Sequence, residues 1–280
     1  MHKVLLGILG LMFLTLPASA QTADQIIANY QKGIGGADKL KAIKTMRMTG
    51  KMNVGGGLEL AMVIENKRPN LVRTDILVQG LNGVNAYDGK TGWKVTPWEG
   101  KKDAETVSED ELKQLIEQAD MDSPLVDYQQ KGHKVELLGK EDVEGTETYK
   151  LKVLLKDGNT NVYYLDVDSY LPIKVESKQI VRGAEVETES TVGDYKQVNG
   201  VYMPYSIVSG AKGSQDKAKI TIQKIEVNVP IEDSRFAMPA AASKQQPAKT
   251  PEDMTIPKKT QPNPNKPAAQ TPAASKPPIS

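Results

Sequence analysis

The sequence contains no cysteine, only two histidines, and only two residues each of phenylalanine and tryptophan. Without cysteine the chain forms no disulfide, thiolate metal site or cysteine nucleophile, and it carries no lipid-modified cysteine. His133 is the one histidine beyond the N-terminal segment, which excludes a histidine-rich metal site. The formal net charge is +1, so charge indicates neither a nucleic acid nor an acidic surface as partner. We expect no cofactor, no metal and no nucleic acid.

Candidate catalytic groups are equally few. The serines lack a G-x-S-x-G setting, and the glycines at 55–57 separate two strand-like runs instead of preceding a helix. Asp166 and Asp168 fit either a carboxylate pair for acid–base or Ca²⁺ chemistry, or polar residues that end a strand. No third ligand or calcium loop accompanies them, which favours the second interpretation. His133 reads as a solvated loop residue, and we expect the protein not to be an enzyme.

The first twenty residues have the pattern of an export signal. A basic start, Met1-His2-Lys3, precedes an apolar run over 4–16, and Pro17-Ala18-Ser19-Ala20 supplies a small-residue cleavage pattern. The apolar run is shorter than a bilayer span requires. We therefore predict an exported protein whose signal peptide, residues 1–20, is cleaved after Ala20.

Residues 240–280 differ in composition from the rest of the chain. Nine of the 17 prolines lie between Pro247 and Pro278, among alanine, lysine, glutamine and threonine. Apolar periodicity is absent, so no core offsets the loss of chain entropy, and we predict a disordered tail. A plain spacer and a segment that contacts anionic envelope polymers or lipids both fit this composition; a spacer is favoured.

Between these ends, the apolar period changes from helical to strand-like. Thr22 and Gln25 form a capping box for a helix over 22–36, and a second short helix follows over 37–44. From residue 45 to 229, apolar and polar residues alternate in about ten segments separated by turns. This pattern predicts an α+β fold with one curled antiparallel sheet, a half-open barrel of about ten or eleven strands, and one domain over 21–239.

One amphipathic helix interrupts the strands over 106–121. Ser108 with Glu111 forms its capping box, and Asp122-Ser123-Pro124 ends it. A single narrow apolar stripe runs along it, formed by Leu112, Leu115, Ile116 and Ala119. A lone helix cannot bury such a stripe by itself, so we expect it to lie across a face of the sheet.

Two hairpins over residues 64–98 carry the most specific signals. Lys67-Arg68-Pro69-Asn70 predicts a turn, and Asp88-Gly89 predicts a hairpin followed by Trp93 and Val95 on one face. These hairpins, K-R-P-N-L and D-G-K-T-x-W-x-x-x-P, resemble those of the LolA/LolB-like lipoprotein-carrier superfamily of bacterial envelopes. Two later phrases, D-Y-K-x-V-N-G-V-Y-M-P and V-P-I-E-D-S-R-F-A-M-P, also resemble it, and the order of elements fits over 22–239.

The resemblance implies a half-open barrel that is closed by N-terminal helices and a lid helix and binds acyl chains in its hollow. The absence of cysteine fits the soluble periplasmic carrier of this superfamily and not its membrane-anchored acceptor. Arg68 aligns with a rim arginine before proline, which implies a latch that hydrogen-bonds the lid backbone in the empty form. A solvated turn residue is the alternative for Arg68. Methionines and aliphatics replace the aromatic lining of the superfamily, so the cargo is left open between a lipoprotein and another lipid.

Alternation alone fits both a filled and a hollow interior, but methionine side chains suit surfaces that repack around variable partners. We predict an apolar cavity lined by Met46, Met48, Met52, Leu58, Leu60, Met62, Ile64, Val72, Ile76, Val78, Trp93, Val95, Leu112, Leu115, Ile116, Leu151, Val153, Ile173 and Val175.

The sequence thus favours a monomeric periplasmic carrier that shelters the acyl chains of lipoproteins or other lipids between an inner-membrane donor and an outer-membrane acceptor. The alternative is a non-enzymatic envelope scaffold with a filled half-barrel and a docking tail.

Overall fold

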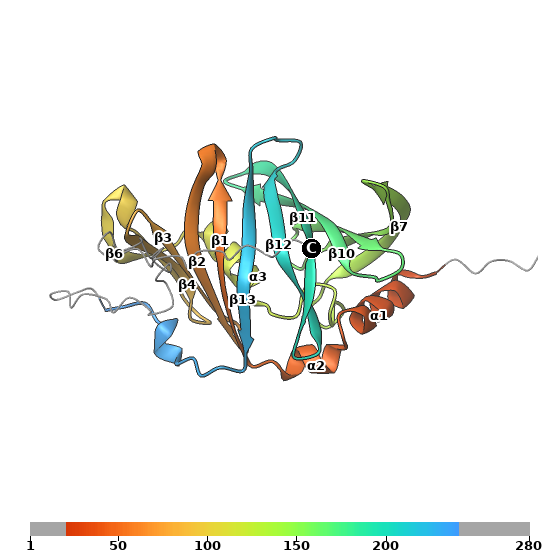
Figure 1. Cartoon of the computed structure of the whole chain (residues 1–280), viewed down its shortest axis with the longest axis horizontal. Coiled ribbons are helices and arrows are strands. Elements are labelled where there is room, and N and C mark those ends of the chain that lie inside the picture. The colour runs from red at the N-terminus through yellow and green to blue at the C-terminus, as the bar shows by residue number, and fades with distance from the viewer. Residues whose placement is uncertain (1–20, 241–280) are drawn as a thin grey trace, which may run out of the picture. The chain divides into compact units, whose positions relative to one another are not determined.

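The computed structural model describes residues 21–240 (Figure 1). The predicted signal peptide and, apart from Ala240, the predicted tail lie outside these residues. Within them, thirteen strands form a single antiparallel sheet in the order β6-β5-β4-β3-β2-β1-β13-β12-β11-β10-β9-β8-β7. The strands are β1 (Thr45–Val54), β2 (Leu58–Lys67), β3 (Leu71–Val78), β4 (Leu81–Tyr87), β5 (Gly92–Thr96), β6 (Lys101–Thr106), β7 (Lys134–Val143), β8 (Thr146–Leu154), β9 (Thr160–Asp166), β10 (Pro172–Val181), β11 (Ala184–Val198), β12 (Val201–Ala211) and β13 (Lys217–Val227).

The number of strands is higher than the ten or eleven predicted. One strand that the pattern missed is β6, whose sequence K-K-D-A-E-T has no apolar alternation. This strand lies at an edge of the sheet and is mostly exposed, so burial imposes no period of two on it. The predicted single curled, unclosed sheet is otherwise what the structure contains.

The connectivity of the sheet places the interior helix. Neighbouring strands are consecutive in sequence except for β1, which pairs with β13. The two edge strands, β6 and β7, are therefore consecutive in the chain although they lie at opposite ends of the sheet. The chain between them carries α3 (Glu109–Ala119), which contacts β3, β4 and β5. We call the face that α3 covers the inner face.

Both longer helices begin as predicted. The Thr22 side chain accepts a hydrogen bond from the backbone N–H of Gln25 at the start of α1 (Ala23–Gly33). The Ser108 side chain accepts one from the backbone N–H of Glu111 at the start of α3. The Gln25 and Glu111 side chains in turn accept a hydrogen bond from the backbone N–H of Thr22 and Ser108, which completes each capping box. The short helix α2 (Ala37–Ala42) follows α1, and 3-10 turns occur at Gly55–Gly57, Pro97–Glu99 and Asp233–Arg235.

The inner face of β7–β9 is packed solid. Ile26, Ile27 and Tyr30 of α1 contact a buried cluster that includes Leu151 and Val153, each with no exposed surface. Leu125 and Val126, from the segment after α3, complete this cluster. This part of the inner face is therefore filled by the protein's own side chains.

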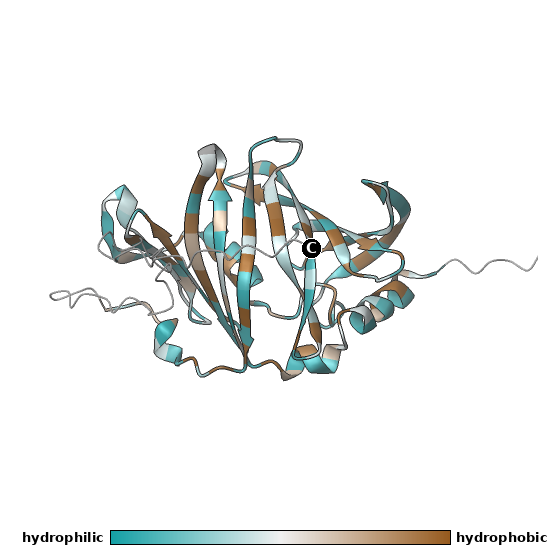
Figure 2. Cartoon of the chain, viewed as in Figure 1, coloured by the Kyte–Doolittle hydropathy of each residue, from teal (hydrophilic) through white to brown (hydrophobic). Residues whose placement is uncertain are grey.

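Hydrophobic and polar residues alternate along the central strands (Figure 2). In β1 and β2 the register pairs Met48 with Ile64 on the inner face and Arg47 with Glu65 on the outer face. This alternation continues into β3, where Thr74 lies opposite Ile64. The candidate site lies over the inner face of these strands.

The outer face of β2–β5 is covered by the chain that follows β13. Trp93 donates a hydrogen bond from Nε1 to the Phe236 carbonyl at 2.7 Å, and both side chains are buried. Arg235 pairs with the buried carboxylates of Glu65 and Asp75, and Arg73 also binds Asp75. The C-terminal strap, residues 228–240, therefore occupies the outer face.

Candidate functional site

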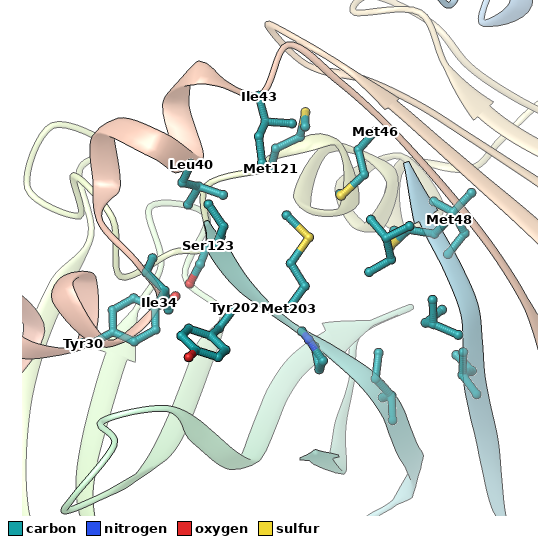
Figure 3. A pocket seen from close by; sticks show the side chains of 17 residues that line it. Tyr30, Ile34, Leu40, Ile43, Met46, Met48, Met121, Ser123, Tyr202 and Met203 are labelled. Carbon is teal, nitrogen blue, oxygen red and sulfur yellow. The ribbon is translucent and has the colours of Figure 1, made fainter. Parts of the chain in front are cut away.

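An apolar cavity of about 220 Å³ lies between the N-terminal helices and the central strands. Figure 3 shows Met46, Met121 and Met203 around its centre, with Tyr30 and Tyr202 toward one end and Met48 toward the other. The remaining lining residues are mainly aliphatic: Ile34, Leu40, Ile43, Ile64, Ser123, Val201, Pro204, Ile207, Ile220, Ile222 and Ile225. We call this space the apolar chamber.

A second cavity of about 530 Å³ lies beside α3, over β1–β4. Its lining is partly apolar, but carboxamide and hydroxyl side chains also contribute to it. The residues that line it are Met48, Met52, Met62, Ile64, Asn66, Val72, Thr74, Ile76, Asn85, Val107, Glu111, Gln114, Leu115, Gln118 and Ile220. We call this space the mixed chamber.

The two chambers adjoin. Met48, Ile64 and Ile220 line both of them, and the three residues lie on the neighbouring strands β1, β2 and β13. Six of the ten methionines line one chamber or both, namely Met46, Met48, Met52, Met62, Met121 and Met203. Flexible thioether side chains allow such a lining to adapt to the shape of its contents.

Most of the apolar stripe of α3 packs against the sheet, and of its residues Leu115 also borders the mixed chamber. Leu115 and Ala119 are buried with Val72 and Tyr87, and Leu112 packs against them. Gly92 allows this close approach, because a Cβ there would lie 2.6 Å from Val107 Cγ2 and 3.0 Å from Leu112 Cδ1. The helix face at Glu111, Gln114, Leu115 and Gln118, one residue in every three or four, borders the mixed chamber.

Arg68 joins α2 to the end of the α3 segment. Its guanidinium donates two hydrogen bonds to the Asp122 carboxylate, and it also donates to the carbonyls of Ile43 and Leu40 at 2.8 and 3.2 Å. Burial opposes ionisation of Asp122, but the Arg68 guanidinium outweighs burial and lowers the pKa of this carboxyl. The resemblance implied that Arg68 bonds the backbone of the lid helix. Its backbone acceptors lie instead at the end of α2, and its partner beyond α3 is the Asp122 side chain.

Two further contacts hold α3 in place. Asn66 donates from Nδ2 to the Gln118 carbonyl at 2.9 Å, so this residue, and not Arg68, bonds the backbone of the helix. At the other end, Lys94 Nζ lies 2.6 Å from Glu111 Oε1. The Lys94 ammonium and the Ser108 backbone amide lower the pKa of Glu111 to about 2. The sequence pattern marked Arg68 by its proline, whereas Asn66 gave no comparable signal.

The structure brings eight of the predicted lining residues to the chambers: Met46, Met48, Met52, Met62, Ile64, Val72, Ile76 and Leu115. Leu58, Leu60 and Val78 lie on the same strands, β2 and β3, but do not line either chamber. Leu112 of α3 packs against the sheet and lines neither chamber.

The other predicted lining residues lie elsewhere, and for these the prediction is corrected. Trp93 and Val95 do share a face, but it is the outer one, where they pack with Val84 and Met238. Leu151 and Val153 belong to the filled part of the inner face, and Val175 of β10 packs against the same cluster. Ile173 falls at an irregularity in the register of β9 and β10, and Ile116 is 45% exposed on the far side of α3.

Strands β12 and β13 supply the largest group of lining residues that the sequence reasoning missed. Ile222 and Ile225 are three positions apart, so simple alternation places them on opposite faces. A register shift against β1, between Thr49 and Gly50, turns both toward the apolar chamber. The carboxamides of α3 were missed because the helix was read only for its apolar stripe.

The candidate chemical groups have structural partners. His133 accepts the Lys156 amide hydrogen bond at Nδ1, so this residue joins a loop to the start of a turn. Asp166 accepts bonds from the backbone of Asp168 and Ser169 and therefore closes a turn. Within residues 21–240, no three histidine, aspartate or glutamate side chains cluster as metal ligands.

A buried polar contact links α3 to β9. Asn161 donates from Nδ2 to Glu117 Oε1 at 3.2 Å, while the buried Oδ1 of Asn161 has no partner. Burial and the nearby Asp157 and Asp120 carboxylates raise the pKa of Glu117, although the Asn161 bond opposes this. A group whose folded-state pKa is raised stabilises the fold at low pH, and this stability is lost as pH rises through that pKa.

We expect Glu117→Gln to raise the free energy of unfolding at pH 7.5 by about 1 kcal/mol. The amide removes the buried charge, and its Nε2 supplies a donor for Asn161 Oδ1. Urea unfolding at pH 7.5 and pH 4 measures the effect, which should shrink at the lower pH because Glu117 is then protonated. Glu136→Gln, an exposed change in β7, is the control; an equal effect of both variants contradicts the interpretation.

No described helix has the length and apolar character that a bilayer-spanning helix needs.

Comparisons with known proteins give matches in structure but little in sequence. A family model described as "Uncharacterized protein" matches residues 115–240. A search of curated protein sequences gives no match. Among solved structures, a LolA superfamily protein from Nitrosomonas europaea is similar with a TM-score of 0.53 and 14% identity, over 78% of this chain and 98% of the other.

Two further structures are similar at a comparable level. A putative outer membrane lipoprotein-sorting protein domain from Vibrio parahaemolyticus gives a TM-score of 0.51 and 14% identity, over 76% of this chain and 94% of the other. A DUF1329 family protein from Desulfovibrio piger gives 0.51 and 15%, over 76% and 97%. At such identity the likeness concerns the fold.

Proposed function

We propose, from the premise that this chain has the LolA-like fold, that it is a periplasmic carrier which shelters acyl chains during transfer between envelope membranes. The observation that carries the proposal is the pair of adjoining chambers over the central strands. The scaffold alternative needs a filled interior throughout, whereas among the described residues the chambers leave space over the central strands. The two chambers are lined largely by methionine and aliphatic side chains, which suit an apolar cargo of variable shape.

The energetics of burial favour such a cargo. Each methylene of an acyl chain contributes about 0.8 kcal/mol when it leaves water. Burial of ten methylenes therefore yields about 8 kcal/mol, which corresponds to micromolar affinity before ordering costs. The chambers have volumes of about 220 and 530 Å³, and together they fall in the range of ligand sites in proteins.

Release requires a competing state. In the empty form α3 is held by Asn66, Lys94 and, beyond its C-terminal end, by Arg68 through Asp122. A charge-assisted hydrogen bond contributes about 1.5–3 kcal/mol, which is small against the burial of a whole chain. We propose that Arg68 is a latch, that a lipid displaces it on entry, and that its return favours release to an acceptor.

The chain has no assigned catalytic role in this proposal. The donor and the acceptor are a membrane or a membrane protein on either side of the periplasm.

We also propose that cleavage after Ala20 leaves a mature chain that begins at Gln21. Mass measurement of the protein from the periplasmic fraction tests the cleavage site.

The direct test of the proposal is the content of the chambers. We expect the protein purified from its native envelope to carry extractable lipid, and the delipidated protein to bind a fluorescent fatty acid with about one site per chain. Native mass spectrometry and fluorescence titration measure the two quantities. A protein that carries no lipid and does not bind the fatty acid would falsify the carrier proposal.

A further inference from the structure

The two chambers differ in the chemistry of their walls. In the apolar chamber the polar lining consists of the Tyr30, Tyr202 and Ser123 hydroxyls. In the mixed chamber, Asn85 and Thr74 on the sheet and Gln114 and Gln118 on α3 add carboxamide and hydroxyl groups. An apolar space and a hydrogen-bonding space thus lie next to each other, and Met48, Ile64 and Ile220 belong to the walls of both.

The polar side chains of the mixed chamber are uncommitted. Thr74 and Asn85 are direct cross-strand neighbours on β3 and β4, and Gln114 and Gln118 lie one turn apart on α3. Among the described residues these four side chains make no hydrogen bond to the protein. A carboxamide offers two donors and an acceptor, so this wall presents both kinds of group to whatever occupies the chamber.

The chamber holds no unpaired charge among its described lining residues. Glu111 is the one ionisable side chain of the set, and Lys94 Nζ lies 2.6 Å from its Oε1. Neutral carboxamides do not offset the desolvation of a phosphate or an ammonium group, which needs an opposite charge. The same groups can satisfy every hydrogen bond of an amide or hydroxyl.

We infer that the mixed chamber binds the uncharged, hydrogen-bonding head of an amphipathic ligand whose alkyl chain lies in the apolar chamber. This inference rests on the proposed carrier function and names its substrate class: a lipid or acylated molecule with amide or hydroxyl groups next to the chain, as opposed to a phosphate or a cationic head. Thr74, Asn85, Gln114 and Gln118 are the residues that recognise the head.

Four probes with the same twelve-carbon chain test the inference by calorimetry below their micelle concentrations. Dodecyl glucoside and N-dodecanoylglycinamide have neutral heads, whereas dodecyl phosphate and dodecyltrimethylammonium are charged. We expect at least one neutral probe to bind roughly tenfold more tightly than both charged probes, and the tighter neutral probe identifies a hydroxyl or an amide head. Equal affinities, or a preference for a charged head, overturn the inference but leave the carrier proposal standing. Failure of all four to bind overturns both.

A double variant and a control test whether the polar side chains of the mixed chamber recognise the neutral head. Asn85→Leu with Gln114→Leu should weaken binding of the tighter neutral probe about tenfold and leave binding of the charged probes unchanged. Gln197→Leu, at an exposed position of β11, is the control and should change neither. Circular dichroism checks that each variant is folded. Unchanged binding of the neutral probe by the double variant contradicts the assigned residues and the inference with them.

Discussion

Replacing Arg68 with leucine is expected to lower the free energy of unfolding by about 3 kcal/mol. The Arg68 and Asp122 side chains are only 18% and 14% exposed, so the change leaves a carboxylate in a poorly solvated position without its cation. It also removes the donors to the Leu40 and Ile43 carbonyls at the end of α2. Chemical denaturation at pH 7.5 measures the loss.

The pH dependence of this loss has a definite sign. The folded-state pKa of Asp122 is lowered, so the pair contributes stability above the ordinary aspartate pKa of about 4 and loses it as pH falls through the folded-state pKa. The difference between wild type and Arg68→Leu should therefore be largest near neutral pH and decline in acid. A difference that does not change with pH would contradict the role assigned to Asp122.

A double variant isolates the pair. Arg68→Leu with Asp122→Leu removes both charges, and we expect it to recover much of the stability because no unpaired carboxylate remains. Arg68→Lys keeps the charge but cannot form the two-pronged bond to a carboxylate, so its stability should lie between those of wild type and Arg68→Leu.

The same residue tests the latch. If Arg68 stabilises the empty form, Arg68→Leu should load a fluorescent fatty acid and release it about tenfold more slowly to acceptor vesicles. Stopped-flow transfer measures this rate in variants shown to be folded. Loading and release equal to those of wild type would show that the latch mechanism is wrong.

Filling the junction of the chambers is expected to have the largest effect on binding. Ile64 lines both chambers from the centre of β2, and tryptophan at this position fits the strand but occupies space that the chain of a ligand needs. Exclusion of four methylenes removes about 3 kcal/mol, so Ile64→Trp should weaken binding of a fatty acid about a hundredfold.

The matched control is Ile180→Trp, since Ile180 is also an isoleucine within a strand but is 55% exposed and lines neither chamber. Fluorescence titration of both variants, with thermal unfolding to verify the fold, separates a lost cavity from a lost structure. Fatty-acid affinity that survives in a folded Ile64→Trp protein would place the ligand elsewhere.

Much of the local structure follows from the sequence alone, because its causes are local. The capping boxes at Thr22 and Ser108, the turn at 68–70 and the Asp88-Gly89 hairpin depend on residues within a few positions of each other. Alternation predicted which residues of β1, β2 and β3 share a face, and on those strands it gave most of the predicted chamber lining that the structure contains.

Only the tertiary structure decided which faces enclose space. A period of two says that residues share a face but not what covers it, so Leu151 beneath α1 and Met48 beside the chambers look alike in sequence. The helical stripe of α3 predicted burial, yet its partner is the sheet around Gly92, which turns Gln114 and Gln118 toward the cavity. The contact of Arg68 with Asp122 joins residues 54 positions apart. Such contacts arise when distant segments pack, and no local pattern specifies them.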